Sequence, residues 1–183
     1  FIEATIRSVI AQTYPHIEYV IVDGASKDNT LEIVNKYRSQ IATVVSEKDK
    51  GLYDAMNKGL NLATGEYVLF LNADDVLADQ HVIASMMAAC HNADVYYGEA
   101  MFMDEEGKDI GLRSEQTPHK VPEQLTWKSL KYGMVVSHQA FIIRRSLSPQ
   151  YDLKYKVCAD VDWMIRGLKG SREICNTHIV VAL

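Results

Sequence analysis

The sequence predicts an α/β protein whose first half is a doubly wound, mostly parallel sheet and whose second half is α+β decoration. Over residues 1–98, short apolar runs alternate with helical patterns, which is typical of parallel strands covered by helices. These runs are apolar at nearly every position, as in strands buried on both faces. After Gly98 the alternation stops and a hairpin pattern follows.

Each expected element has its own pattern. The segments with helical spacing in the first half are residues 2–12, 30–37, 52–63 and 82–89. The expected buried strands are residues 17–22, 41–45, 67–71 and 95–97. Turn residues separate them, as at Tyr14-Pro15, Asp23-Gly24 and Thr64-Gly65. The second half should contain a hairpin with its turn at 104–108, a strand at 140–143 and a helix at 160–168.

The composition is that of a globular domain. Of the 183 residues, 48% are hydrophobic and 23% are charged, which excludes a disordered or collagen-like chain. Because no linker or internal repeat is visible, we expect one domain over residues 1–183. The net charge is -5 and no run of Lys or Arg occurs, so no nucleic-acid partner is expected.

The cysteines suggest a protein of the reducing cytoplasm, and the chain ends suggest a segment of a longer protein. Cys90, Cys158 and Cys175 are far apart and odd in number, so neither a disulfide framework nor a zinc site is expected. No apolar run approaches the ~20 residues that cross a bilayer. The chain begins at Phe1, inside an expected helix and without a methionine, and we expect it to be part of a longer protein.

Carboxylates follow two of the expected strands. In open α/β sheets, ligands bind beyond the carboxyl ends of the strands, where Asp23 and the pair Asp74-Asp75 stand. Asp23 also fits an ordinary Asp-Gly turn. Adjacent carboxylates repel each other unless a cation such as Mg²⁺ or Mn²⁺ neutralises them. The alternative is that Asp75 caps the following helix while Asp74 is solvated.

Two further carboxylates, Asp160 and Asp162, open the expected helix at 160–168, next to Trp163. They fit a favourable interaction with the helix dipole, or one of them serves as a general base. A lone His138 is more simply a structural hydrogen-bonding residue. No G-x-G-x-x-G, G-x-x-x-x-G-K-[ST] or G-x-S-x-G motif occurs, which disfavours dinucleotide oxidoreductases, P-loop NTPases and elbow-type hydrolases.

Four segments, in order along the chain, resemble motifs of the family 2 glycosyltransferases, which are inverting enzymes with the GT-A fold. Residues 20–30 read V-I-V-D-G-A-S-K-D-N-T and resemble I-V-V-D-D-G-S-x-D-x-T. Residues 47–59 read E-K-D-K-G-L-Y-D-A-M-N-K-G, a form common in bacterial polysaccharide members. Residues 63–75 read A-T-G-E-Y-V-L-F-L-N-A-D-D and resemble A-x-G-E-Y-I-x-F-L-D-x-D-D. Residues 159–163 read A-D-V-D-W and resemble the acceptor-site motif E-D-x-x-W.

This resemblance implies that a sugar moves from a nucleotide diphosphate to a hydroxyl with inversion. Residues 1–98 would bind the nucleotide sugar and residues 99–183 the acceptor. The implied donor-binding residues are Asp23, Gly24, Asp49, Gly51, Asn57, Asn72, Ala73 and Asp74. Asp74 and Asp75 would hold Mg²⁺ or Mn²⁺, and Asp160 would be the catalytic base. The implied acceptor-side residues are His138, Asp162 and Trp163.

The chain departs from the family pattern in three places. Asn72 stands where the family has the first Asp of its D-x-D motif, which leaves Asp74 as the principal metal contact. Ala159 replaces the Glu that precedes the base. The strand and T-x-N-type loop that open family members are missing, as is the C-terminal end. We therefore expect the chain as it stands to bind the donor poorly or not at all.

The resemblance also implies partners and a setting. The expected donor is a UDP-sugar and the expected acceptor a glycan or a lipid-linked molecule, in a cytoplasmic enzyme with peripheral contact to the inner membrane face. Two rival functions would share the fold. A non-catalytic nucleotide-sugar or glycan-binding module would keep Asp23 without needing Asp160. A phosphotransferase or nucleotidyltransferase would use Asp74 and Asp75 on phosphorus. The motif around Asp160 disfavours both rivals.

Overall fold

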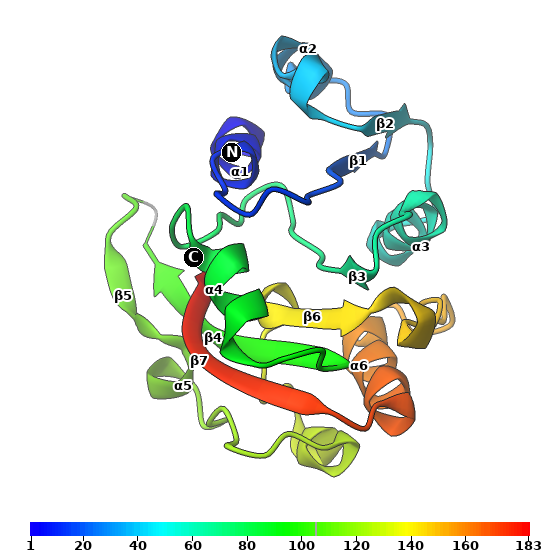
Figure 1. Cartoon of the computed structure of the whole chain (residues 1–183). Coiled ribbons are helices and arrows are strands. Elements are labelled where there is room, and N and C mark those ends of the chain that lie inside the picture. The colour runs from blue at the N-terminus through cyan, green and yellow to red at the C-terminus, as the bar shows by residue number, and fades with distance from the viewer. Residues whose placement is uncertain (105) are drawn as a thin grey trace.

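The computed structural model describes residues 1–104 and 106–183 (Figure 1). Its α-helices are α1 (Ile2–Ile10), α2 (Thr30–Lys36), α3 (Leu52–Leu62), α4 (Val82–Ala89), α5 (Arg113–Gln116) and α6 (Ala159–Gly170). Its strands are β1 (Val20–Asp23), β2 (Thr43–Ser46), β3 (Tyr67–Val68), β4 (Val95–Met103), β5 (Asp109–Leu112), β6 (Phe141–Arg144) and β7 (Ile174–Ala182). Short 3₁₀ helices are η1 (Arg38–Gln40), η2 (Trp127–Tyr132), η3 (His138–Ala140) and η4 (Arg145–Leu147). Within these described ranges, no helix is both long and apolar enough to cross a membrane.

The strands form two sheets. β1 and β2 run parallel, with Val20 opposite Thr43. The larger sheet has the order β3-β6-β4-β5, and β7 also pairs with β4. There, β4 runs antiparallel to β5 and β6 and parallel to β7, and β3 runs antiparallel to β6. The expectation of a mostly parallel sheet is therefore wrong, because the hairpin after Gly98 and the returning strand β6 reverse the chain direction.

Most elements of the first half lie close to their expected bounds. The expected strand at 67–71 is shorter, since β3 ends at Val68. The predicted hairpin is present as β4 and β5, although residue 105 of its expected turn lies outside the described residues. The nine-residue strand β7 is an addition. The sequence does not reveal it because Asn176, Thr177 and His178 interrupt its apolar pattern.

The core lies on both faces of β4 and β6. Tyr97 and Ile143 pack with Trp163 of α6 on one face, whereas Tyr96 and Ile142 pack in the cluster that contains α4. This division follows from the strand geometry, in which successive side chains point to opposite faces. A separate cluster joins α1, β1 and α2. Figure 1 shows β1, β2 and α2 at one end of the molecule, away from the large sheet.

Two cysteines that were expected to be free are joined. Cys90, at the end of α4, forms a disulfide with Cys175 of β7, with 6.2 Å between the Cα atoms. Only Cys158 is free, and it is exposed. The expectation of no disulfide is therefore wrong. Spacing could not reveal the pair, because packing of α4 against β7 brings together positions 85 residues apart.

A glycine controls how closely β4 and β7 approach. A Cβ on Gly98 would overlap the Ile179 carbonyl oxygen and lie 2.8 Å from Val181 Cγ2. We expect Gly98→Ala to lower the free energy of unfolding by ~1–3 kcal/mol, because backbone cannot yield cheaply to an added methyl group. Urea unfolding measures the change. The matched control is Gly59→Ala in α3, where the nearest atom would be 3.7 Å away and a gain of ~0.5–1 kcal/mol is expected. Equal effects of the two variants would contradict this account.

Candidate functional site

Asp23 stands at the carboxyl end of β1, as predicted, and is 6% exposed. Its carboxylate accepts hydrogen bonds from the Ser46 hydroxyl at 2.6 Å and from the Ser26 backbone N–H at 3.1 Å. Burial raises the pKa of Asp23, but the hydrogen bonds outweigh burial and hold the pKa below its ordinary value. The structure thus keeps an ionised hydrogen-bond acceptor at the carboxyl end of β1. The hydrogen bond from Ser26 also stabilises the turn that follows Asp23, as the sequence allowed.

Gly24, Asp49 and Gly51 come together beside Asp23. A Cβ on Gly24 would overlap the Asp49 carboxylate, so a larger residue here would require that carboxylate to move. Asp49 Oδ1 in turn accepts the Gly51 N–H at 2.9 Å. Gly51 has a φ of 117°, which favours glycine, and it caps the N-terminus of α3. Three predicted donor-binding residues therefore meet where the loop after β2 enters a helix, and a helix N-terminus favours anions.

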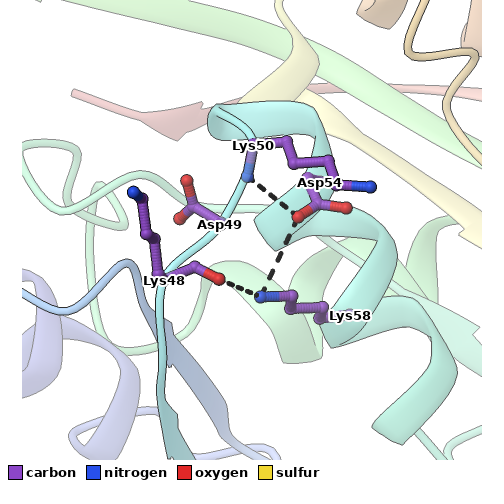
Figure 2. Close-up of a pocket in the computed structure, with 5 residues that line it drawn as sticks. All are labelled: Lys48, Asp49, Lys50, Asp54 and Lys58. Atoms are coloured by element: carbon purple, nitrogen blue, oxygen red, sulfur yellow. Dashed lines mark hydrogen bonds and ion pairs between the residues drawn. The ribbon is translucent and has the colours of Figure 1, made fainter.

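A hollow of about 500 Å³ opens at this loop, lined by Lys48, Asp49, Lys50, Asp54 and Lys58. Figure 2 shows Lys58 reaching back from α3, where its ammonium donates to the Lys48 carbonyl at 3.1 Å. Lys58 also pairs with Glu47 at 2.9 Å. Lys48 and Lys50 form no ion pair with any residue that the structure describes. The hollow therefore offers two cations to an anionic ligand.

Asp74 and Asp75 differ in their surroundings. Asp74 is exposed, whereas Asp75 is half-buried and its Oδ2 accepts hydrogen bonds from Gln139 Nε2 at 2.8 Å and from the Asn72 N–H at 3.2 Å. Burial, and to a smaller degree the charge of Asp74, raises the pKa of Asp75. The neighbouring Ala73 contributes its carbonyl to Thr5 Oγ1 at 2.9 Å. Asp75 thus closes the loop after β3, and Asp74 is the group that faces outward.

These carboxylates fit a divalent cation only in a site shared with a ligand. Within residues 1–104 and 106–183, no group of three or more His, Cys, Asp or Glu side chains is arranged to hold a metal ion. Mg²⁺, however, is often bound by one or two carboxylates together with substrate phosphates. Because the charge of Asp74 contributes, to a smaller degree than burial, to the raised pKa of Asp75, a cation held by the outward Asp74 carboxylate would relieve the repulsion between the two groups.

Asp160 and Asp162 lie in the first turn of α6 but have different partners. Asp162 is ion-paired with Arg166 at 2.7 Å, one turn along the helix. Asp160 Oδ1 lies 3.2 Å from the Tyr53 hydroxyl and 2.9 Å from the Val161 N–H. It forms no ion pair with a described residue. Of the two helix-opening carboxylates, Asp160 is therefore the one that remains available to a substrate.

Beneath Asp160 lies a buried aromatic cluster. His138 is 5% exposed, and its Nε2 lies 2.7 Å from the Tyr151 hydroxyl. Its ring stacks on Phe70, and Trp163 stacks on Tyr151 with ring centroids 5.2 Å apart. Trp163 is fully buried. His138 and Trp163, which the resemblance places on the acceptor side, therefore both lie buried in the cluster next to Asp160.

Asn57, a predicted donor-binding residue, is hydrogen-bonded to the backbone of Tyr151 in the same aromatic cluster. Its Nδ2 donates to the Tyr151 carbonyl at 3.0 Å and its Oδ1 accepts the Tyr151 N–H at 2.7 Å. Both hydrogen-bonding ends of the amide are thus occupied by backbone. Tyr53 and Tyr151 are the site residues that sequence reasoning missed. Tyr53 lies inside the L-Y-D-A-M-N segment and could have been singled out there, whereas Tyr151 stands in no motif.

The burial of His138 predicts a pH-dependent stability. Desolvation lowers the pKa of His138 to about 4 from 6.5, against the opposing charge of Asp160. Between these values the unfolded chain binds a proton that the folded chain does not. The stabilisation is therefore complete above pH 6.5 and is lost as the pH falls towards 4, by ~3 kcal/mol.

This prediction is tested by urea unfolding of the unsubstituted protein and of His138→Gln from about pH 7.5 to pH 4.5. The glutamine variant has no titrating group at this position, so its free energy of unfolding should fall less steeply over that range. Parallel curves for the two proteins would show that His138 is not held neutral by the fold.

Known proteins resemble this chain in sequence and in structure. Residues 1–150 match the family described as Glycosyl transferase family 2. The chain is 34% identical over 186 residues to a PGL/p-HBAD biosynthesis glycosyltransferase of Mycobacterium bovis (strain BCG / Pasteur 1173P2), covering 98% of this chain and 69% of that protein.

Among solved structures, S. aureus TarS in complex with UDP-GlcNAc matches with a TM-score of 0.77 and 22% identity, covering 100% of this chain and 54% of that one. TarS in complex with UDP matches with a TM-score of 0.77 and 21% identity, covering 100% and 55%. The chain thus spans about half the length of these TarS chains. The structural likeness confirms the expected α/β fold.

Proposed function

Because the chain belongs to glycosyl transferase family 2, we propose that it carries the centre that moves a sugar from a nucleoside diphosphate to an acceptor hydroxyl, with inversion at the sugar. The observation that carries this proposal is the arrangement around Asp160. A carboxylate that forms no ion pair with a described residue stands at a helix start. A loop suited to anions enters α3 two residues before Tyr53, whose hydroxyl lies 3.2 Å from that carboxylate.

The proposed donor is a UDP-sugar. Asp23 offers an ionised hydrogen-bond acceptor to the nucleoside, while Gly24, Asp49 and Gly51 shape the adjoining loop. Lys48 and Lys50 supply positive charge for the diphosphate. Two observations on relatives support this choice: the mycobacterial relative is a glycosyltransferase, and TarS is similar in fold and has been solved with UDP-GlcNAc. We propose that residues 1–98 provide most donor contacts and residues 99–183 the acceptor side.

The proposed metal is Mg²⁺ or Mn²⁺, held by Asp74 with support from Asp75. When bound, the ion would neutralise charge that develops on the departing diphosphate. The chain's own part is to present the Asp74 carboxylate outward while Gln139 and the Asn72 N–H hold Asp75 in place. Asn72 and Ala73 belong to the same loop, and we propose that they contact the donor.

Asp160 is the proposed general base. Its carboxylate accepts the proton of the attacking hydroxyl, and the helix start and the Tyr53 hydroxyl fix its orientation. Asp162 cannot serve equally well, because Arg166 engages it in an ion pair. We propose that it helps to orient the acceptor side. A module that only bound nucleotide sugars would not depend on Asp160, whereas a transferase needs a base at this position.

The proposed setting is the synthesis of a surface glycan or glycolipid at the cytoplasmic face of the membrane. The printed name of the mycobacterial relative, in PGL/p-HBAD biosynthesis, supports a role of this kind. The Cys90–Cys175 disulfide is the one feature that fits an oxidising compartment better.

If Asp160 is the general base, replacing it should reduce turnover without reducing nucleotide affinity. Asp160→Asn keeps the size and hydrogen bonding of the side chain but removes its basicity, so turnover should fall by at least ~100-fold while UDP affinity stays unchanged. The measurement is release of UDP from a matched donor and acceptor, with calorimetry for UDP binding, on protein that carries the N-terminal strand and loop expected of the family. Asp162→Asn, the matched control one half-turn away, should lose less. Retained turnover in Asp160→Asn, or an equal collapse of UDP affinity, would contradict the assignment.

The metal assignment predicts a cation-dependent affinity. UDP should bind more tightly with Mn²⁺ than with EDTA, and Asp74→Asn should abolish that difference, because it removes the outward carboxylate charge. Calorimetry in both buffers, on protein with the expected N-terminal strand restored, measures the difference. Asp109→Asn, at an exposed position on β5, is the charge-matched control. If UDP binds equally in Mn²⁺ and in EDTA, Asp74 has no metal role.

A further inference from the structure

The first helix, α1, carries two stripes of side chains that contact different parts of the proposed donor site. Residues three or four apart on a helix share a face. Ile2, Ile6 and Ile10 form an apolar stripe of this kind, and they pack in the cluster that contains Ile21 of β1. Because β1 ends at Asp23, the apolar stripe attaches α1 to the sheet that carries the proposed nucleoside contact.

The second stripe is polar and consists of Thr5 and Ser8 in α1 and Gln12 just after it. It contacts the segment between β3 and α4, which carries the paired carboxylates and passes next to α1 in Figure 1. Ser8 Oγ accepts the Leu77 N–H at 3.1 Å. Gln12 Oε1 accepts the Ile83 N–H, also at 3.1 Å. The polar stripe therefore holds the backbone of this segment along much of its length.

Thr5 makes the contact of this stripe that lies nearest to Asp74. Thr5 is 3% exposed, and its hydroxyl donates to the Ala73 carbonyl at 2.9 Å. That carbonyl belongs to the peptide group that joins Ala73 to Asp74. Because a peptide group is planar, the hydrogen bond also restrains the nitrogen and the Cα atom of Asp74. The direction in which the Asp74 side chain leaves the backbone therefore depends on a hydroxyl 68 residues before Ala73 in the chain.

The Asp74 side chain has no hydrogen-bonding partner of its own within residues 1–104 and 106–183, and it is exposed. The residues that follow it are held separately. Gln139 donates to the Asp75 carboxylate at 2.8 Å, and the Val76 N–H donates to the Leu183 carbonyl at 3.1 Å. The segment is thus fixed after Asp74 by β6-side and β7-side contacts, and before it by α1.

We propose that Thr5 is a positioning residue for the divalent cation. Its hydroxyl holds the peptide between Ala73 and Asp74 in the orientation that presents the Asp74 carboxylate to Mg²⁺ or Mn²⁺ bound with the donor diphosphate. The inference rests on the proposed metal role of Asp74. Without the hydroxyl, binding of the ion would include the entropic cost of ordering this peptide. Because α1 also packs on the sheet that ends at Asp23, one helix places the nucleoside contact and the metal contact relative to each other.

The test compares Thr5→Val with the unsubstituted protein, both with the expected N-terminal strand restored. Calorimetry measures Mn²⁺ binding at saturating UDP, and UDP binding in EDTA. Thr5→Val removes the hydroxyl and should weaken Mn²⁺ binding about fivefold or more, as expected for one lost hydrogen bond, while UDP binding in EDTA stays unchanged. Thr5→Ser keeps the hydroxyl, so its Mn²⁺ affinity should stay within about twofold of the unsubstituted protein.

The matched control is Thr177→Val in β7. Thr177 is 8% exposed and its hydroxyl donates to the Tyr97 carbonyl at 2.9 Å, so this variant loses an equivalent hydrogen bond outside the segment between β3 and α4. It should lower the free energy of unfolding in urea much as Thr5→Val does, without changing Mn²⁺ binding. Equal weakening of Mn²⁺ binding by both valine variants would overturn the proposal, because the effect would then be one of general stability.

Two further results would overturn it: unchanged Mn²⁺ binding in Thr5→Val, or binding in Thr5→Ser that is as weak as in Thr5→Val. If Thr5→Val does not fold, Ser8→Ala takes its place. This variant removes the acceptor of the Leu77 N–H and should weaken Mn²⁺ binding about twofold or more. Unchanged Mn²⁺ affinity in Ser8→Ala would then contradict the positioning role of α1.

Failure of this inference and failure of the proposed function give different results. If Mn²⁺ does not tighten UDP binding in the unsubstituted protein, the metal assignment and this inference are both wrong. If Mn²⁺ tightens UDP binding and Thr5→Val leaves that effect unchanged, only this inference is wrong. If Thr5→Val acts as expected but no UDP is released from any donor, the positioning role stands and the glycosyltransferase assignment falls.

Discussion

Two side chains of α3 hold the candidate site together. Asn57 clamps the backbone of Tyr151 through both ends of its amide, and Tyr53 reaches the Val157 carbonyl and Asp160. These contacts join positions about a hundred residues apart in the chain. Because Gly51 of the donor-side loop caps the same helix, the loop and the carboxylate of α6 are fixed relative to one rigid element. Precise placement of reacting groups is a large part of enzymatic rate enhancement.

The aromatic cluster explains how Asp160 is supported without a cation. His138 is buried and neutral, with its pKa lowered to about 4, and its ring nitrogen is satisfied by the Tyr151 hydroxyl. Burial also raises the pKa of Tyr151, with a smaller contribution from the Asp160 charge, so this hydroxyl keeps its proton. His138 and Tyr151, which lie buried next to Asp160, are therefore uncharged and well packed. Asp160 is the charged group beside them.

The two hollows divide the chemistry of the site. The hollow at the loop after β2 is lined by charged residues alone. A second hollow of about 330 Å³, between the start of α3 and the segment before α6, also has Leu52, Leu153 and Val157 in its lining. Lys50 and Asp54 line both. The start of α3 thus forms the boundary between the two hollows, and the Tyr53 hydroxyl, from the wall of the second, lies 3.2 Å from Asp160 Oδ1.

The sequence by itself determined the local features of this protein. Helical spacing predicted α1, α3, α4 and α6 close to their observed bounds, and turn chemistry predicted that β1 ends at Asp23. These features depend on neighbouring residues, whose periodicity and turn chemistry are visible in the chain. The tertiary structure alone decided the sheet polarity, the strand β7 and the Cys90–Cys175 pair. It also decided that the Trp163 side chain is buried in the core. Each of those depends on which distant segments pack together, and local patterns do not specify that choice.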